Sequence, residues 1–411
     1  MKILHVFDFF SPWGAGTVGV LYKLLPAMAQ KGHEVVVYTS DFKLDQDYID
    51  SVPELKIHPF HCVSSLGRFY VTPSLVGAAR QHLKDFDVIH LHAFRSYQNI
   101  VIHHYARKYG IPYIIDHHGS LPRVAAGESS PKWLLRWFFD ITFGYRLLKH
   151  AVKVVANNQF GVREYQKFGV TDEKIAIIPQ SIAVNEFLNL PPPGEFRQRY
   201  NLKDKRIIMF LGRIHRIKGL DFLVKSFYQL SRSRSDVLLA IVGDDDGYKN
   251  KLEQLVSKLN ISSRVLFTGF LAGQDKLAAL VDADVVVQPS RYDYSPLAPY
   301  EAVLCGTPVI VSGNSGVGEE MTSINAGYLV EFGDISQMVQ LIQSILDDPA
   351  KAREQVNRAK EYTVNHMRLS DRVNDYERLY RQCIELNVQS GGSNEGSGNR
   401  GRRVHRQPSL R

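Results

Sequence analysis

The chain has 411 residues, more than one hydrophobic core usually organises, so its length predicts two domains. Apolar residues make up 44% and charged residues 22%, which is typical of a folded globular protein and excludes a disordered chain. No run of about eighteen uncharged apolar residues predicts a membrane-spanning helix. Three widely spaced cysteines, Cys62, Cys305 and Cys383, match neither a disulfide framework nor a zinc motif, and they favour a cytoplasmic location.

The net charge of +8 is unevenly distributed along the chain: +4 in residues 1–187, zero in 188–387 and +4 in 388–411. The last segment is rich in Gly, Ser, Asn and Arg and lacks apolar periodicity, so it is predicted to be a disordered basic tail. Outside this tail no basic patch is interleaved with aromatic residues. Nucleic acid is therefore not expected as a partner.

Short β-branched runs alternate with amphipathic helical patterns along the whole chain, which predicts parallel sheets covered by helices on both faces. The first half offers as strands KILHVFDF, EVVVYTS, DVIHLH, PYIIDHH, VKVVANN and KIAIIP. The second half offers RIIMFLG, VLLAIVG, RVLFTG, ADVVVQPS, TPVIVS and GYLVEFG. A Pro-rich linker, LNLPPPGEFRQRYNL, separates the halves. We expect two doubly wound α/β domains, 1–187 and 188–387, with ligands bound between the carboxyl ends of their strands.

A glycine-rich turn follows the first predicted strand, with Gly14, Gly16 and Gly19 in the segment SPWGAGTVG. It resembles the phosphate-binding turn of a dinucleotide fold, although this spacing alone is a weak indicator. The acidic residue expected about twenty positions on is not clear, because Glu34 opens the second strand instead of ending it. A nicotinamide-dependent dehydrogenase is therefore disfavoured.

Histidines cluster near the strand ends of the first half, and DHHGSLPR places His117 and His118 toward the expected cleft. A metal site is conceivable if they joined His90, His92 and the pair at 103–104. These histidines lie on different elements, without a nearby cysteine or a helical H-x-x-x-H pattern. No metal is therefore expected.

The segment 129–150, SSPKWLLRWFFDITFGYRLLKH, predicts a basic amphipathic helix rich in Trp and Phe. Lys132, Arg136 and Asp140 form a polar stripe on it, and Arg136 and Asp140 are predicted to pair. Such a helix either lies in a membrane interface or packs into the core of its own domain.

The segment GRIHRIKG places Arg213 and Lys218 just after a strand, with Gly212 and Gly219 allowing close backbone approach. Two cations at a strand–helix junction suit a diphosphate leaving group, on which negative charge develops. The alternative is a pair of solvated surface cations.

The segment RYDYSPLAPYEAVLCGTPVIVS contains two acids, Asp293 and Glu301, separated by seven residues. Ser295 suits a helix N-cap, Pro296 the first helical position and Gly306 the end of the helix. The helix N-terminus would form an anion site, and Glu301, about a turn and a half in, would reach a sugar hydroxyl beside it. A structural salt bridge is the alternative role for Glu301.

Taken together and in this order, these segments resemble the retaining GT-B glycosyltransferases of glycosyltransferase family 4. The matching stretches lie within residues 1–385 and are Ala15–Gly16, KGHEV, HGS at 118–120, GRIHRIKG, GDDDG at 243–247, VLFTGFLAGQDKLAAL and the two acids at 293 and 301. The resemblance implies the GT-B fold, two Rossmann-like domains facing across a cleft, with the acceptor on the first domain and the nucleotide sugar on the second. The terminal helix of the second domain, within 188–387, is expected to pack back toward the first.

The resemblance also implies roles for individual residues. Arg213 and Lys218 would bind the donor diphosphate, Glu301 the nucleotide ribose, and Asp293 and His118 would lie beside the transferred sugar. Backbone groups would complete the donor site at Gly16, Gly212, Gly243, Phe270, Ser295 and Leu297. Three departures from the family pattern stand out: Asp293 replaces the usual Glu, Pro296 stands where Gly is common, and IPQSIAVNEF replaces the common Pro-Asn-Gly-[Val/Ile]-Asp.

The resemblance implies transfer of a hexose from a UDP- or GDP-linked donor to a glycan or lipid-linked acceptor, with retention of anomeric configuration and no metal or other cofactor. A net-basic first domain with an aromatic helix agrees with a peripheral enzyme on the inner face of the cytoplasmic membrane, acting in polysaccharide or glycolipid synthesis. A nucleotide-sugar epimerase and a nucleotide-sugar-binding protein without turnover remain alternatives.

Overall fold

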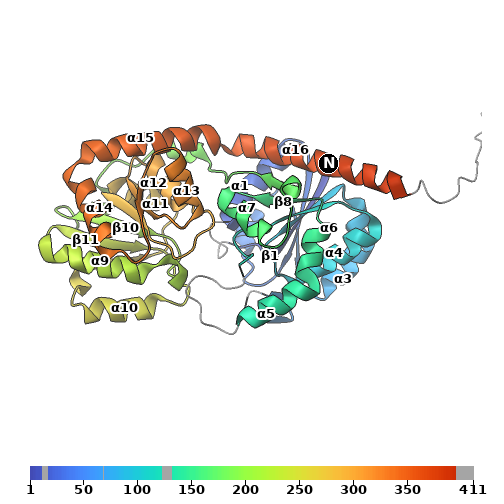
Figure 1. Cartoon of the computed structure of the whole chain (residues 1–411), viewed down its shortest axis with the longest axis horizontal. Helices are drawn as coiled ribbons and strands as arrows, with labels where there is room; N and C mark the ends of the chain where they lie inside the picture. Colours follow the sequence, from blue (N-terminus) through green and yellow to red (C-terminus); the bar gives the residue numbers. More distant parts are fainter. Residues whose placement is uncertain (12–16, 68, 123–131, 395–411) are drawn as a thin grey trace, which may run out of the picture.

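The computed structural model describes residues 1–11, 17–67, 69–122 and 132–394, and it folds into two α/β lobes (Figure 1). Each lobe contains one parallel sheet covered by helices. In both sheets the central strands are almost wholly buried runs of Val, Ile and Leu, as expected for strands covered on both faces.

The N-terminal sheet has seven parallel strands in the order β3-β2-β1-β6-β7-β8-β9. Their bounds are β1 Lys2–Phe9, β2 Glu34–Ser40, β3 Lys56–Phe60, β6 Val88–His92, β7 Tyr113–Asp116, β8 Lys153–Ala156 and β9 Ile175–Ile177. The helices around it are α1 Thr17–Gln30, α2 Gln46–Asp50, α3 Ser74–His82, α4 Tyr97–Tyr109, α5 Lys132–Phe139, α6 Tyr145–His150 and α7 Gln159–Gln166. The strand order reverses between β1 and β6, so the carboxyl ends of these two strands border the binding crevice of a doubly wound sheet.

Two features of this domain were not predicted from the sequence. The edge strand β3 contains Pro59 and is largely solvent-exposed, so it lacks the apolar run that marks the other strands. A short antiparallel hairpin, β4 Ser64–Leu66 and β5 Phe69–Val71, follows it.

The C-terminal sheet has six parallel strands in the order β12-β11-β10-β13-β14-β15. Their bounds are β10 Arg206–Leu211, β11 Val237–Val242, β12 Val265–Gly269, β13 Val285–Gln288, β14 Val309–Ser312 and β15 Tyr328–Val330. The helices are α8 Glu195–Arg199, α9 Leu220–Ser233, α10 Lys249–Lys258, α11 Gly273–Asp282, α12 Ala298–Leu304, α13 Gly316–Ser323, α14 Ile335–Asp347 and α15 Pro349–His366. All the strands predicted for this half are present.

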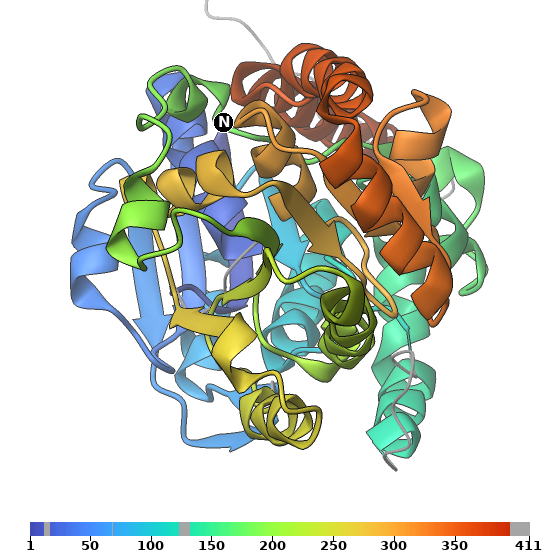
Figure 2. The same cartoon turned by 90° about the vertical axis from the view of Figure 1, so that its left-hand side faces the viewer.

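The last helix, α16 Leu369–Asn394, leaves the C-terminal lobe and lies along the N-terminal lobe (Figures 1 and 2). Its residues Tyr376, Tyr380 and Cys383 are buried in the same core as Leu21 and Leu24 of α1. The helix also extends seven residues into the range 388–411 that the sequence predicted to be disordered. A helix that is already nucleated by packing adds further turns at little cost, which explains this difference.

Candidate active site

The cations predicted to bind a diphosphate lie at the carboxyl edge of the C-terminal sheet. Lys218 ends a short 3-10 turn, η6 Arg216–Lys218, just after β10. Its Nζ donates to Asp293 Oδ2 at 2.6 Å, and Ser290 Oγ donates to the same oxygen at 2.9 Å. Both charged side chains are largely buried, with 14% and 12% of their area exposed. The structure therefore brings Lys218 and Asp293, which are 75 residues apart, into one contact.

Arg213 follows β10 directly and forms an ion pair with Asp246 of the GDDDG turn. Both side chains are partly exposed and thus accessible to a ligand. The turn at Gly212 and the turn at Gly243 pack with their backbones in direct contact. A Cβ on Gly243 would lie 1.9 Å from the Gly212 carbonyl oxygen. Gly212 and Gly243 both have positive φ angles, 151° and 142°, which a residue with a side chain rarely adopts. The two glycines therefore allow the close packing of the turns at the carboxyl edge of the sheet, where Arg213 lies.

The helix after Asp293 begins later than predicted. Its N-cap is Leu297 and its first residue Ala298, so Ser295 is not the N-cap and Pro296 is not the first helical residue. A proline does stand near the helix start, but it is Pro299. The residues before Ala298 are instead held by contacts of Tyr294, described below. Gly306 does follow the helix, with φ of 86°.

As a consequence of this later start, Glu301 lies in the first turn of α12 and not a turn and a half along it. Its Oε1 accepts a hydrogen bond from Lys276 Nζ at 2.9 Å, so the predicted alternative of a salt bridge is also present. The side chains of Lys276 and Glu301 remain 23% and 19% exposed. Of the expected backbone positions, Ser295 and Leu297 are half-buried and Phe270 is exposed.

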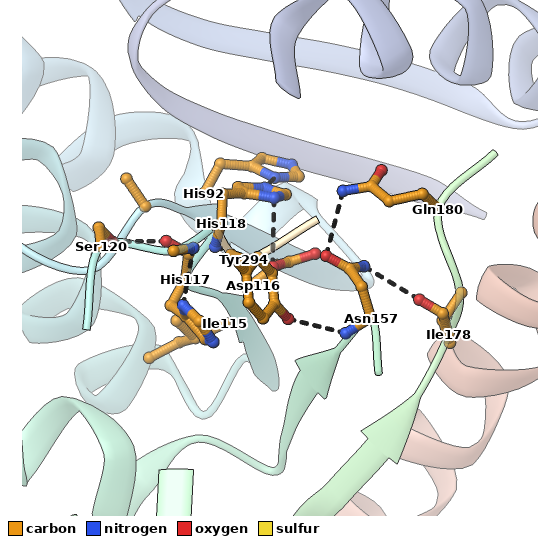
Figure 3. Close-up of polar contacts among 12 residues, drawn as sticks. His92, Ile115, Asp116, His117, His118, Ser120, Asn157, Ile178, Gln180 and Tyr294 are labelled. Atoms are coloured by element: carbon orange, nitrogen blue, oxygen red, sulfur yellow. Dashed lines mark hydrogen bonds and ion pairs between the residues drawn. The ribbon is translucent and has the colours of Figure 1, made fainter. Parts of the chain in front are cut away.

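His118 lies on the opposite side, just beyond β7 in the N-terminal domain. Its backbone adopts a left-handed conformation with φ of 46°, and its N–H donates to Asp116 Oδ1 at 3.1 Å. Its Nε2 is 2.9 Å from Nδ1 of His92, on neighbouring strand β6 (Figure 3). Burial lowers the pKa of His118 to about 3, so the ring is neutral. Burial raises the pKa of Asp116 to about 7, against the effect of hydrogen bonds from the His118 N–H and the Tyr376 hydroxyl.

The histidines group differently from the set considered in the sequence. His5, His90 and His92 place ligand-type atoms within 4.8 Å of one another in the buried core. Burial lowers the pKa of all three, so they are neutral. Hydrogen bonds already join His92 to His5, at 2.9 Å, and His90 to the Tyr380 hydroxyl, at 2.8 Å. His5 and His92 thus form a buried hydrogen-bonded chain that leads to His118, whereas His90 is bonded to Tyr380 instead.

A residue that sequence reasoning missed, Tyr294, joins the two domains. Its hydroxyl accepts a hydrogen bond from the Asn157 N–H at 2.7 Å, and its carbonyl accepts one from Asn158 Nδ2 at 3.0 Å. Its ring lies 4.4 Å from that of His117 (Figure 3). The side chain is 5% exposed, and a Cβ on Gly161 would collide with it. A tyrosine between Asp293 and the Ser-Pro pair was the only available signal.

Through these contacts Tyr294 connects the two predicted halves of the site. In the C-terminal domain, Asp293 directly precedes Tyr294 in sequence. In the N-terminal domain, the Tyr294 ring contacts His117, and His118 is the next residue. Gly16, predicted to approach the donor, lies outside the described residues.

The predicted aromatic helix is present as α5, followed by a π-helical turn at Asp140–Gly144 and then α6. In both views α5 lies at the rim of the N-terminal lobe (Figures 1 and 2). It is not buried in the core: Leu135 and Phe138 are 60% and 59% exposed. The other exposed apolar residues here are Trp133, Leu134, Trp137, Ile141, Phe143 and Tyr145.

The described contacts of the Asp140 carboxylate are with Arg95, and not with the suggested partner Arg136. Asp140 is buried, and its carboxylate accepts two hydrogen bonds of 2.8 Å from Arg95, a residue far away in sequence. Arg95 also donates to the carbonyl groups of Ser120 and Leu121, in the loop after His118. Within the described residues no helix is both long and apolar enough to cross a membrane.

Comparison with known protein families gives two matches that together span most of the chain. The model for Glycosyltransferase Family 4 matches residues 14–186, and the model for Glycosyl transferases group 1 matches residues 194–362. The gap between them coincides with the Pro-rich linker.

Individual relatives are distant. The chain is 25% identical over 275 residues to 2-deoxystreptamine glucosyltransferase of Streptomyces kanamyceticus, which covers 62% of this chain and 67% of that enzyme. It is 28% identical over 183 residues to a GDP-mannose-dependent alpha-(1-6)-phosphatidylinositol monomannoside mannosyltransferase of Mycolicibacterium smegmatis, covering 43% of this chain and 48% of the relative. The matched region thus spans about half the length of that second relative.

Among solved structures, Anabaena HepE in complex with UDP superposes with a TM-score of 0.74 at 18% identity, covering 93% of this chain and 100% of that one. At this level of identity the likeness establishes the fold alone.

Proposed function

Because the chain belongs to the GT-B glycosyltransferases of glycosyltransferase family 4, we propose that it transfers a hexose from a UDP- or GDP-linked donor to a glycan or lipid-linked acceptor. The observation that carries the proposal is the pair of cations at the carboxyl edge of the C-terminal sheet, Lys218 and Arg213, each held by a carboxylate. This arrangement provides positive charge for a diphosphate at the place where ligands of doubly wound sheets bind.

The donor diphosphate would take over the contacts that Lys218 and Arg213 now make with Asp293 and Asp246. Charge develops on the diphosphate as its bond to the sugar breaks, and cations already fixed at that position stabilise it without reorganisation. Asp293, released from Lys218, would then accept a hydrogen bond from a hydroxyl of the transferred sugar. In this proposal Arg213 and Lys218 neutralise the leaving group, so the reaction requires no metal.

The other residues of the proposed donor site would bind the remaining parts of the nucleotide sugar. Glu301 would bind the ribose hydroxyls, and the backbone at Ser295 and Leu297 would face the phosphates. Gly243 and Phe270 would border the nucleotide base. His118 would lie beside the sugar, and the departing phosphate oxygen would take the proton of the acceptor hydroxyl, which attacks with retention of configuration.

The exposed apolar surface of α5 supports an acceptor at a membrane. Aromatic and leucine side chains exposed together on a helix suit insertion at the lipid interface, and Arg146 and Lys149 follow in α6 to meet anionic headgroups. One of the relatives acts on a phosphatidylinositol monomannoside, which is a lipid acceptor. We place the enzyme on the inner face of the cytoplasmic membrane, in glycolipid or polysaccharide synthesis. A nucleotide-sugar epimerase would have no use for such a surface.

The donor assignment is tested by thermal unfolding of the full chain with UDP, GDP, ADP or NAD. A ligand at about 1 mM that binds only the folded state raises the apparent stability according to its concentration relative to Kd. We expect a rise with UDP or GDP and none with NAD. Stabilisation by NAD alone, or by no nucleotide, would contradict the diphosphate site.

The membrane assignment is tested by co-sedimentation with vesicles that contain phosphatidylglycerol. The double variant Leu135→Glu and Phe138→Glu should lose vesicle binding and keep the nucleotide-induced thermal shift. Leu188→Glu is the matched control, because Leu188 is equally exposed but lies in the linker between domains. Undiminished vesicle binding of the double variant would refute the role of α5.

A further inference from the structure

The two segments that carry Lys218 and Asp293 pack with their backbones in direct contact. Gly219, which follows Lys218, has a φ of 68°, and a Cβ on it would lie 2.0 Å from the Pro289 carbonyl oxygen. The carbonyl group directly before Lys218 accepts a hydrogen bond from the Arg291 N–H at 2.8 Å. The contact between Lys218 and Asp293 is therefore made on a backbone framework that these neighbouring residues define.

The side chain of Arg291 extends this framework. Its Nη2 donates to Asp221 Oδ2, in the first turn of α9. Its guanidinium carbon lies 4.5 Å from the centre of the Phe332 ring, two residues after β15, and that ring in turn contacts Phe222 at 5.2 Å between centres. The side chains of Arg291 and Asp221 are 20% and 21% exposed, so their ion pair is better shielded than one on the open surface. Arg291 thus joins its own loop, the start of α9 and the chain after β15.

Arginine suits this position better than any other cation. Its planar guanidinium pairs with the Asp221 carboxylate and lies over the Phe332 ring at the same time, whereas a lysine ammonium is a strongly hydrated point charge. Close control of position matters here, because a misplacement of about 1 Å at a reacting centre can cost on the order of 100-fold in rate. A residue that fixes the segments around Lys218 therefore affects the proposed chemistry without touching the donor.

From these contacts we propose that Arg291 is a positioning residue for sugar transfer: it holds the Asp293 segment against the turn that carries Lys218. Asp221 and Phe332 are the side chains through which it does so. The inference rests on the proposed transferase function and deepens it by naming a support of the diphosphate site that none of the sequence motifs assigned. In this proposal Arg291 acts through the placement of Lys218 and does not itself contact the donor.

The first measurement needs no substrate. The full chain is treated with acetic anhydride at a temperature well below unfolding, and the acetylation rate of Lys218 is determined by mass spectrometry relative to that of exposed Lys225 on α9. The variants are Arg291→Gln, which removes the charge, and Arg291→Lys, which keeps it. Arg234→Gln is the matched control, because Arg234 is 22% exposed and forms ion pairs of its own at the C-terminal end of α9.

We expect Lys218 to be acetylated several-fold faster in Arg291→Gln than in the wild type, at an intermediate rate in Arg291→Lys and at the wild-type rate in Arg234→Gln. Thermal unfolding is recorded for each protein, because a loss of global stability alone leaves the reactivity of Lys218 in the folded state unchanged. Equal acetylation of Lys218 in the wild type and in both Arg291 variants would overturn the inference, whatever their stability.

The second measurement is sugar transfer, with kcat and KM for the donor determined separately. In Arg291→Gln, kcat should fall about 10- to 100-fold with a smaller change in KM, because the charge on the leaving diphosphate is greatest in the transition state. Arg291→Lys should recover part of this loss, and Arg234→Gln should match the wild type. A wild-type kcat in Arg291→Gln would overturn the inference.

The partner residue supplies a further check on the same contact. Asp221→Asn should resemble Arg291→Gln, and the double variant should be no slower than the slower single variant, because both changes break one interaction. Losses that add in the double variant would contradict a joint role. A wild type that transfers sugar from no donor would instead refute the proposed transferase function, and the acetylation rates would still decide whether Arg291 holds Lys218 in place.

Discussion

The two sides of the candidate active site differ in the charge and exposure of their polar side chains. On the C-terminal side, charged groups are paired and partly exposed, as in Arg213 with Asp246 and Lys276 with Glu301. On the N-terminal side the polar groups are buried and the histidines neutral, and several nitrogens and oxygens have no partner among the described residues. The first arrangement suits a charged ligand that replaces existing ion pairs. The second keeps the core of the N-terminal domain free of charged histidines.

This contrast has a consequence for stability. Ion pairs near the surface contribute little to folding and are screened by salt, whereas an unpaired buried polar group imposes a cost that changes with protonation. The N-terminal domain should therefore be the more sensitive of the two to pH, and the C-terminal side should be the more sensitive to removal of a charge.

The largest expected effect is acid destabilisation of the N-terminal domain. Burial lowers the pKa of His5 and His118 to about 3, and it lowers those of His90, His92 and His117 in the same direction. The unfolded chain binds protons below about pH 6.5 that the folded chain excludes, so stability is complete above that pH and falls as the pH drops toward 3. At pH 5, each histidine with a folded pKa of about 3 lowers the free energy of unfolding by about 2 kcal/mol.

Intrinsic fluorescence isolates this effect, because all three tryptophans, Trp13, Trp133 and Trp137, belong to the N-terminal domain. The fluorescence midpoint of thermal unfolding should fall between pH 7.5 and pH 5, because the five histidines together outweigh Asp116, whose raised pKa of about 7 acts in the opposite direction. His5→Gln should flatten that dependence, and His61→Gln, at an exposed histidine, should not. A midpoint that stays constant with pH would contradict the description of these histidines as buried and neutral.

Removal of a cation on the opposite side should affect turnover. Lys218→Ala should cost on the order of 2–4 kcal/mol of transition-state stabilisation, roughly 30- to 1,000-fold in kcat/KM, because the leaving diphosphate loses a fixed positive charge. The measurement is sugar transfer or donor hydrolysis with the nucleotide sugar whose nucleotide gives the thermal shift. Lys225→Ala, an exposed lysine on α9, is the control. Wild-type turnover by the Lys218 variant would refute the site assignment.

Glu301→Ala should cost about 2 kcal/mol, at the lower end of the same range, because it removes a hydrogen bond to an uncharged ribose. Because Glu301 also forms an ion pair with Lys276, variants of both residues distinguish a role in ribose binding from a role in holding the local structure. If Glu301 contacts the ribose, Glu301→Ala raises KM for the donor more than Lys276→Ala does. Equal effects of the two variants would indicate that the salt bridge itself is what matters.

Local patterns in the sequence predicted much of this architecture, because strands and turns are encoded by neighbouring residues. Buried β-branched runs marked the central strands, and the glycines around Arg213 and Gly243 marked turns that need positive φ. Lys218 was placed correctly at the carboxyl edge of a strand for the same reason. The edge strand β3 was missed because its residues are exposed and include Pro59.

Contacts between distant segments were not predictable in this way. Arg136 was suggested as a partner for Asp140 from its spacing along the helix, but the described contacts of the Asp140 carboxylate are with Arg95, which is 45 residues away in sequence. The start of α12 was misplaced since Tyr294 is held by Asn157 and Asn158 from the other domain. The return of the terminal helix to the N-terminal domain was expected, but the residues of α16 that enter its core, such as Tyr376 and Tyr380, could not be named from local patterns.

The smallest predicted effect concerns Tyr294, which connects the two sides. Tyr294→Phe removes the acceptor for the buried Asn157 N–H, and leaving that donor unpaired should cost about 1–3 kcal/mol of stability. Tyr292→Phe is a closely matched control, because the Tyr292 hydroxyl is buried with no hydrogen-bond partner in the described part of the chain. Its removal should be neutral or slightly stabilising. Thermal unfolding of both variants gives the comparison directly. Unchanged stability of Tyr294→Phe would mean that aromatic packing, which this substitution retains, and not the hydrogen bond to Asn157 holds the two sides of the site together.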